Sequence, residues 1–274
     1  MHMNTIKKDI INRTDLTWSK TRRSSGTAGS FLKAEEVING RKIYYKLSNY
    51  EQGKGVVGHE CINEIIVDRL LNIWGIEHLH YDLVHMKINV FGDEIITWVC
   101  ASEDFKQVGE SKIAMELWYE MEANADETHM EFVQRKGCAD YIYNMLAVDY
   151  LILNRDRHGA NIELLKNRVT KTYRPAPLFD HGLSMILEND PDKIRAFDIT
   201  KTKQVQCFVG RTDPEINVRL IPRDRMPELR PFTEADREYI FADMDTCISP
   251  ELREKIWELL NYRRNMYESI RNQK

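Results

Sequence analysis

The residues best suited to chemistry lie at 151–161, where the sequence reads Leu-Ile-Leu-Asn-Arg-Asp-Arg-His-Gly-Ala-Asn. An apolar segment ends there in side chains that can bind protons, metals and phosphates. Asp156 and Asn161 are five positions apart. A loop of that length can direct the carboxylate to a substrate hydroxyl and the amide oxygen to a metal ion. We therefore place the candidate chemistry in this loop.

A second candidate ligand follows at residues 176–180, an apolar segment that we predict to be a strand ending in a single carboxylate, Asp180. Gly182 would let the backbone turn sharply after it. Magnesium prefers hard oxygen ligands and keeps several waters, so Asp180, Asn161 and the phosphates of a nucleotide form a suitable set. A capped, hydrogen-bonded turn is the alternative for either segment alone. Together the two segments favour a metal site.

Small residues dominate the stretch from 24 to 30, as a loop that covers phosphates requires, because glycine lets backbone N–H groups approach an anion closely. The Walker pattern is absent, since Gly29 is followed by Ser30, and this disfavours a P-loop NTPase. A flexible loop is the alternative. The predicted nucleotide contacts in this loop are Ser25, Gly26, Thr27, Ala28, Gly29 and Ser30.

The loop leads into a predicted β-hairpin around Asn39-Gly40. In its second strand, alternation places Tyr44 and Lys46 on one face, so Lys46 can lie beneath the loop and meet phosphates. A solvent-facing lysine is the alternative.

A helix is predicted from about residue 58 to 71, ending near Gly75. It carries Glu60 and Glu64 one turn apart on one face. Either glutamate could pair with Lys46, and we favour Glu64 because it lies deeper in the apolar part of the helix. Two surface charges are the alternative.

The remaining pattern predicts an α+β fold of two lobes, a small β-rich N-lobe over 1–105 and a larger helical C-lobe over 106–274. Strands at 81–88 and 94–101 complete the small sheet, and the backbone near Val99 to Ala101 would meet the adenine edge of a nucleotide, with a plain core strand as the alternative. Helices are predicted at 112–122, 128–136 and 139–153, then a hairpin from 162 to 179 and a helical tail that begins with a capping box at Thr233.

Composition narrows the class of protein. Of 274 residues, 42% are hydrophobic and 30% charged, the balance of a globular protein. The net charge of −4 argues against a nucleic-acid coat, and the five scattered cysteines suggest neither a disulfide framework nor a zinc site. No apolar run is long enough to cross a bilayer and no secretory signal is evident, so we expect a cytoplasmic protein, with export or translocation without a signal peptide left open.

Asn154-x-Asp156-x-His158-x-x-Asn161, followed by Asp180, resembles the active-site pair of HipA-like Ser/Thr kinases, and the size is nearer to the short members of that family. Agreement runs from about Ser24 to Gly182. The resemblance implies that Asp156 is the catalytic base or hydroxyl orienter, that Asn161 and Asp180 bind Mg²⁺, and that Lys46, partnered by Glu64, binds the phosphates of ATP. His158 would orient the loop, with a buried structural histidine as the alternative. The family's autophosphorylation makes Ser24 or Ser25 a candidate switch.

Two departures from the family are expected to matter. There is no room before Ser24 for the extra N-terminal domain of the longer members, and Asp180 is followed by His181-Gly182 where eukaryotic kinases have Phe-Gly. These departures argue against a HipA-type toxin and against that family's DNA-binding antitoxin partner. The prediction is a Ser/Thr protein kinase that acts on a protein substrate, with a monomer as one possible state, no membrane partner and nucleic acid disfavoured. The alternatives are a catalytically silent nucleotide-binding scaffold, a DNA-associated accessory protein that uses Arg22, Arg23 and the basic C-terminal helix, and a phosphoinositide or small-molecule kinase.

Overall fold

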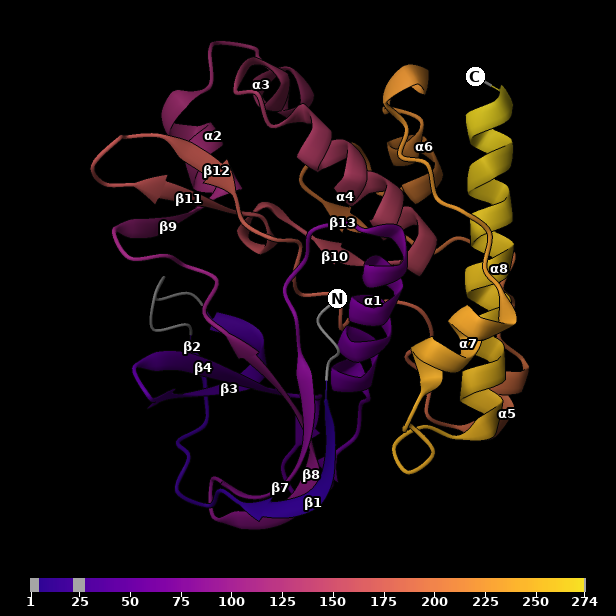
Figure 1. The fold of residues 1–274 in the computed structure, drawn as a ribbon. Helices are drawn as coiled ribbons and strands as arrows, with labels where there is room; N and C mark the ends of the chain where they lie inside the picture. The colour runs from indigo at the N-terminus through magenta and orange to yellow at the C-terminus, as the bar shows by residue number, and fades with distance from the viewer. Residues whose placement is uncertain (1–4, 22–27, 274) are drawn as a thin grey trace.

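The computed structural model describes residues 5–21 and 28–273, with only the backbone described for residue 21 and residues 28–30. A twisted β-sheet forms one part, and a larger, mainly helical part lies against it (Figure 1). Helix α1, Glu60–Trp74, lies between them, packed on the sheet on one side and on helix α7 on the other. This helix therefore links the two parts of the molecule.

The sheet has six strands in the order β1-β7-β8-β4-β3-β2, antiparallel except for the β1–β7 pair. The predicted hairpin around Asn39-Gly40 is present, and both residues have the positive φ that its tight turn requires, 50° and 78°. The strands are β1 Ile6–Asn12, β2 Ser19–Thr21, β3 Ala28–Ile38, β4 Arg41–Leu47, β7 Asp82–Val90 and β8 Asp93–Glu103. A separate pair of short strands, β5 Tyr50–Glu51 and β6 Gly55–Val56, precedes α1.

Helix α1 is unusual in being buried around its whole circumference from Glu60 to Leu71. Its apolar side chains fill the core beneath the sheet, and the predicted end at Gly75 is a left-handed cap with φ 66°. Glu64 and Asp68 are also buried, with 0% and 1% of their surface exposed. Buried carboxylates require partners, so their contacts define what this helix holds in place.

In the helical part, α4 (Ala139–Ile152) is largely buried and packs against α6 (Pro214–Val218) and α8 (Pro250–Gln273). The predicted helix at 139–153 is confirmed, as is the capping box formed by Thr233 and Asp236 at the start of α7. The other elements are α2 Met115–Glu122, α3 His129–Arg135, β10 Asp156–Arg157, η1 Gly159–Asn161, α5 Pro191–Arg195, β13 Gln206–Cys207, η2 Arg223–Arg225 and α7 Glu234–Phe241.

Two predictions for this part were wrong. The helix predicted at 112–122 begins only at Met115, because β9, Glu110–Ala114, pairs with β11, Glu163–Asn167, which also pairs with β12, Tyr173–Pro175. Residues 176–180 do not form a strand. Pro177 has no N–H to donate to a ladder, and the segment instead makes an isolated bridge between Leu178 and His78.

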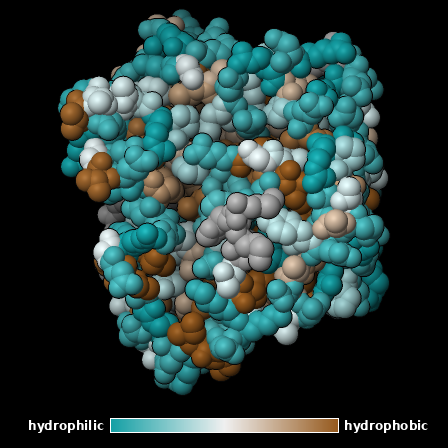
Figure 2. Space-filling view, in the orientation of Figure 1, coloured by the Kyte–Doolittle hydropathy of each residue, from teal (hydrophilic) through white to brown (hydrophobic). Residues whose placement is uncertain are grey.

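Figure 2 shows a largely hydrophilic face on which hydrophobic residues form scattered groups. Single exposed apolar side chains are normal on globular proteins. Over residues 5–21 and 28–273, no helix combines the length and apolar character needed to traverse a bilayer.

Candidate active site

The loop at 153–161 starts where α4 ends. Leu153 takes a left-handed conformation, φ 55°, which turns the chain away from the helix axis. Asn154 donates from Nδ2 to Oδ1 of Asp149 at 2.8 Å and accepts from the backbone N–H of Asp156 at 3.3 Å. Asp156 and Arg157 then form β10, which pairs in parallel with β13. The loop is thus fixed to the helix at one end and to a strand in its middle.

Arg157 is the main anchor of this loop and was not predicted from the sequence. Its side chain is 2% exposed, and its guanidinium binds Asp149 through two hydrogen bonds. Burial opposes the charge, but the attraction of Asp149 outweighs it and raises the pKa of Arg157 above its ordinary value. The signal that could have indicated the pair is Asp149 itself, a carboxylate within the strongly apolar helix at 139–152.

Both carboxylate oxygens of Asp156 have a neighbouring nitrogen from the same loop. Asn161 donates from Nδ2 to the backbone oxygen of Asp156 at 3.0 Å and to its Oδ2 at 3.4 Å. His158 accepts the backbone N–H of Ala160 at Nδ1, 3.2 Å, so in the neutral ring the proton is assigned to Nε2, which lies 3.5 Å from Oδ1 of Asp156. The three predicted loop residues therefore lie together, with Asn161 and His158 positioned to orient Asp156.

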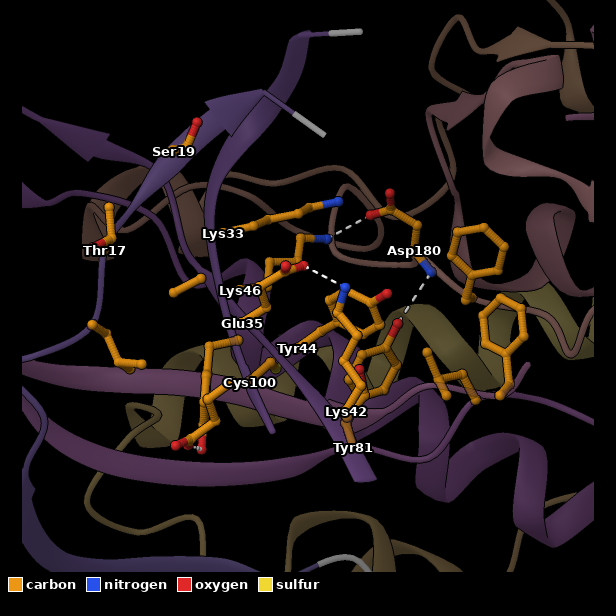
Figure 3. A pocket seen from close by; sticks show the side chains of 18 of the residues that line it. Thr17, Ser19, Lys33, Glu35, Lys42, Tyr44, Lys46, Tyr81, Cys100 and Asp180 are labelled. Carbon is orange, nitrogen blue, oxygen red and sulfur yellow. Dashed lines mark hydrogen bonds and ion pairs between the residues drawn. The ribbon is translucent and has the colours of Figure 1, made fainter. Parts of the chain in front are cut away.

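Lys46 lies on the other side of the site, between two carboxylates that are far apart in the sequence. Its Nζ is 2.7 Å from Oε1 of Glu64 and 2.5 Å from Oδ1 of Asp180, as Figure 3 shows for the second contact. Burial opposes the positive charge, but Asp180 and Glu64 raise the pKa of Lys46 well above its ordinary value. Glu60 lies apart from this pair and accepts the backbone N–H of Asn49 at 3.0 Å.

Glu64 also fixes the turn after Asp180. Its Oε2 accepts the backbone N–H of His181 at 2.9 Å, while Asp180 itself has a positive φ of 61° and donates its own N–H to the hydroxyl of Tyr81 at 3.4 Å. A Cβ at Gly182 would lie 3.0 Å from Cβ of Glu60. The turn that carries Asp180 is thus packed against α1.

A cavity of about 500 Å³ opens beside these groups. Lys33 and Lys46 both extend toward Asp180 in it (Figure 3). Further basic and aromatic side chains on its walls are Lys42, Tyr44, Phe105, Lys112 and Phe179. Positive side chains above an acidic group are suited to binding a polyphosphate together with a cation.

The segment whose backbone is predicted to meet the adenine edge lies within β8. Val99 is fully buried in the sheet's core, and the backbone of Ala101 pairs with β4 and β7 on its two sides. Side chains alternate along a strand, and those of Cys100 and Ser102 line the cavity. The predicted contact of this backbone with an adenine stays a prediction.

Of the predicted phosphate loop, Ser25, Gly26 and Thr27 lie outside the described residues, as do Ser24 and the two arginines at 22 and 23. Ala28, Gly29 and Ser30 are the first residues of β3, and only their backbone is described. Their predicted contacts with a nucleotide stay predictions.

A strand lysine paired with a helix glutamate, facing a D-x-x-x-x-N loop and a further aspartate, is the arrangement of a protein-kinase-like fold. No family model matches the chain, and no curated protein matches its sequence. A solved structure of the proinflammatory kinase CtkA of Helicobacter pylori is similar, with a TM-score of 0.62 and 14% identity over 88% of this chain and 93% of that chain.

A second similar chain comes from the complex of the Shewanella oneidensis MR-1 toxin–antitoxin system HipA, HipB and its operator DNA. Its TM-score is 0.48 and its identity 14%, over 93% of this chain and 68% of that chain. At such identity the likeness to CtkA shows the fold, and the predicted α+β, two-part kinase-like fold is confirmed.

Proposed function

We propose that this chain transfers the γ-phosphoryl group of ATP to Ser or Thr hydroxyls of protein, including its own, with Mg²⁺ as cofactor. The observation that carries the proposal is the simultaneous contact of Lys46 with Glu64 at 2.7 Å and with Asp180 at 2.5 Å. A protein kinase requires both the lysine–glutamate pair and the metal-binding aspartate to be in place. The likeness to the fold of CtkA supports the same class.

The side chains present fit magnesium. Asp180 offers a carboxylate, and the amide nitrogen of Asn161 is bound to Asp156, so the atom of Asn161 suited to a metal is its oxygen. Both are the hard oxygen ligands that magnesium prefers. When bound, Mg²⁺ would supply charge neutralisation on the phosphates.

The chain's own residues supply the remaining functions. Lys46 carries a charge that two carboxylates stabilise, and it would bind phosphate oxygens at the wall of the cavity. Asp156, oriented by His158 and Asn161, would accept or steer the proton of the acceptor hydroxyl. The cavity volume of about 500 Å³ is within the range of small-molecule sites, which is consistent with a nucleotide.

The experiment is incubation of the purified chain with γ-labelled ATP and Mg²⁺, alone and with casein as a general Ser/Thr acceptor. Asp156→Asn and Asp180→Asn are compared with Asp192→Asn, whose side chain is 90% exposed on α5. We expect label in the wild type and in Asp192→Asn and about 10²–10⁴-fold less in Asp156→Asn. Mass spectrometry then locates any label, with Ser24 or Ser25 the proposed acceptors.

ATP binding seen as a thermal shift, with no transfer to either acceptor by any variant, would replace the proposal by a nucleotide-binding module. Equal transfer by wild type and Asp156→Asn would reject the role of Asp156. Label on a lipid or small molecule with none on protein would assign another acceptor class to the same site.

A further inference from the structure

A second cluster of possible metal ligands lies farther along α1 than the Lys46–Glu64 pair. It consists of Asp68, one turn after Glu64, with His78 and His80 from the segment between α1 and β7. One ligand atom from each of the three side chains lies within 4.8 Å of the other two. Oδ1 of Asp68 is 3.2 Å from Nε2 of His78 and 3.4 Å from Nδ1 of His80.

The hydrogen bonds of His78 create a conflict at its second nitrogen. Nδ1 lies 2.6 Å from the backbone oxygen of Ile76, an atom that can only accept, so Nδ1 carries a proton. In the neutral ring Nε2 then carries a lone pair and no proton, and it lies 3.2 Å from Oδ1 of Asp68. Two acceptors at that separation are satisfied either by a proton shared between them or by a metal ion.

The two separations from Oδ1 of Asp68 to the histidine nitrogens suit a metal ion. Tetrahedral zinc with bonds of about 2.0–2.1 Å places its ligand atoms roughly 3.3–3.4 Å apart, close to the 3.2 and 3.4 Å found here. Imidazole nitrogens with one carboxylate are a common donor set for zinc and related ions. The contact of His78 Nδ1 with Ile76 is the outer hydrogen bond that metal-binding histidines usually make.

Hydrogen bonds also fix the orientation of the Asp68 carboxylate. Its Oδ2 accepts the backbone N–H of Tyr81 at 2.7 Å, and Asn72 donates from Nδ2 to its Oδ1 at 2.9 Å. Asp68 and His78 are closed off from solvent, with 0% and 3% of their side chains exposed, whereas His80 is 39% exposed. The cluster thus has a fixed inner side and one route open to solvent.

We propose that Asp68, His78 and His80 bind a divalent transition-metal ion of the zinc class, with water as the fourth ligand. The site is separate from the proposed magnesium site and does not depend on the proposed kinase activity. Its ion would join α1 to the segment at 76–81, which bridges to Leu178 just before Asp180. A His78–Asp68 ion pair that binds no metal is the rival explanation.

The test uses the full chain, stripped with a chelator and titrated with Zn²⁺ and, separately, with Co²⁺. Bound metal is counted by equilibrium dialysis, and the visible spectrum of Co²⁺ reports its ligands. The variants are His80→Asn, at the exposed ligand, and Asp68→Asn, which keeps the side-chain shape. His129→Asn is the matched control, because His129 is a partly exposed histidine stacked on Phe208 outside the cluster.

We expect one zinc ion bound by the wild type and by His129→Asn. Affinity should fall by about 100-fold or more in His80→Asn and in Asp68→Asn, since even outer-shell changes typically cost 10–100-fold. The Co²⁺ form should show a tetrahedral visible band without thiolate charge transfer. Asp156→Asn combined with His158→Asn, which removes the other histidine–carboxylate contact near the active site, should bind zinc as the wild type does.

The proposal is overturned if the wild type binds no zinc, which would leave the ion pair. It is also overturned if His80→Asn and Asp68→Asn bind zinc as tightly as the wild type. A thiolate band in the Co²⁺ spectrum would place the ion on a cysteine instead.

Discussion

The guanidinium of Arg157 binds the carboxylate of Asp149 edge to edge, with Nε 2.9 Å from Oδ2 and Nη2 3.0 Å from Oδ1. Its third nitrogen donates to the backbone oxygens of Asn161 and Phe179 at 3.2 and 2.8 Å. One buried side chain therefore joins helix α4, the loop that carries Asp156 and Asn161, and the segment that ends in Asp180.

Replacing Arg157 by Met should lower the free energy of unfolding by about 3–5 kcal/mol, because it leaves the largely buried carboxylate of Asp149 without a positive charge beside it. Urea unfolding measures the loss. Arg195→Met is the matched control, since its ion pair with Asp192 is exposed and should change stability by no more than about 0.5 kcal/mol. Adding Asp149→Leu to Arg157→Met should restore part of the loss. Equal costs for Arg157→Met and Arg195→Met would show that the pair is not an anchor.

Glu64→Gln should reduce phosphoryl transfer much more than Glu60→Gln does. Lys46 loses one of its two carboxylates in the first variant, and a misplaced catalytic group can cost about 100-fold. Glu60 instead binds the backbone of Asn49. Initial rates with labelled ATP measure the difference, with thermal unfolding of both variants as the check on folding. Similar rates for the two variants would mean that Glu64 does not position Lys46.

His181 should make the protein less stable in mild acid. Burial, reinforced by the positive charge of Arg157, lowers the pKa of His181 well below its ordinary value of 6.5. Below about pH 6.5 His181 binds a proton in the unfolded chain but not in the folded chain, and this favours unfolding. The stability that His181 contributes is therefore complete above that pH and is lost as the pH falls toward the pKa of the folded state.

The measurement is the free energy of unfolding by urea at pH 7.5, 6.5 and 5.5 for the wild type and for His181→Asn. Removing His181 should reduce the slope of the free energy of unfolding against pH by up to about 1.4 kcal/mol per pH unit. Parallel curves for the two proteins would show that His181 takes up its proton in the folded state as readily as in the unfolded one.

Gly159→Ala should disturb the active-site loop. Its new Cβ would lie 2.5 Å from Cβ of Glu116 and 3.1 Å from that residue's Cα, so η1, which carries Asn161, would have to move. We expect a loss of about 1–3 kcal/mol in stability together with a lower transfer rate. Gly137→Ala, in open space with φ 73°, should cost backbone strain alone and leave the rate unchanged. A fully active Gly159→Ala would show that the loop tolerates the shift.

Local pattern was enough to predict several parts of the site. Alternation placed Lys46 on one face of its strand with Tyr44, because short-range geometry determines which way side chains point. The deeper position of Glu64 in the apolar part of its helix favoured it over Glu60 as the partner of Lys46. The loop at 154–161 was predicted from the spacing of its polar residues after an apolar helix. These residues contact one another within a few positions of the sequence.

Other features depend on contacts between distant segments. Residues 112–114 continue the helical pattern of the residues after them, and only pairing with β11 makes them a strand. Strand β1 has six exposed residues among its seven and shows no alternation. The pair Arg157–Asp149 and the cluster of Asp68 with two histidines form only when the chain folds back, and neither has a spacing that marks a site.

The position of β1 has a consequence for self-association. This strand forms one edge of the sheet and pairs with β7, whose residues Leu83, Val84, Met86, Ile88 and Val90 are buried. Its own exposed positions include Lys7, Lys8 and Asp9, and charged side chains discourage another chain from adding to an edge. Without β1, the apolar strand β7 would become the edge. Strand β1 thus places three charged residues at this edge in front of the apolar β7, and it exposes Ile10 and Ile11 there as well.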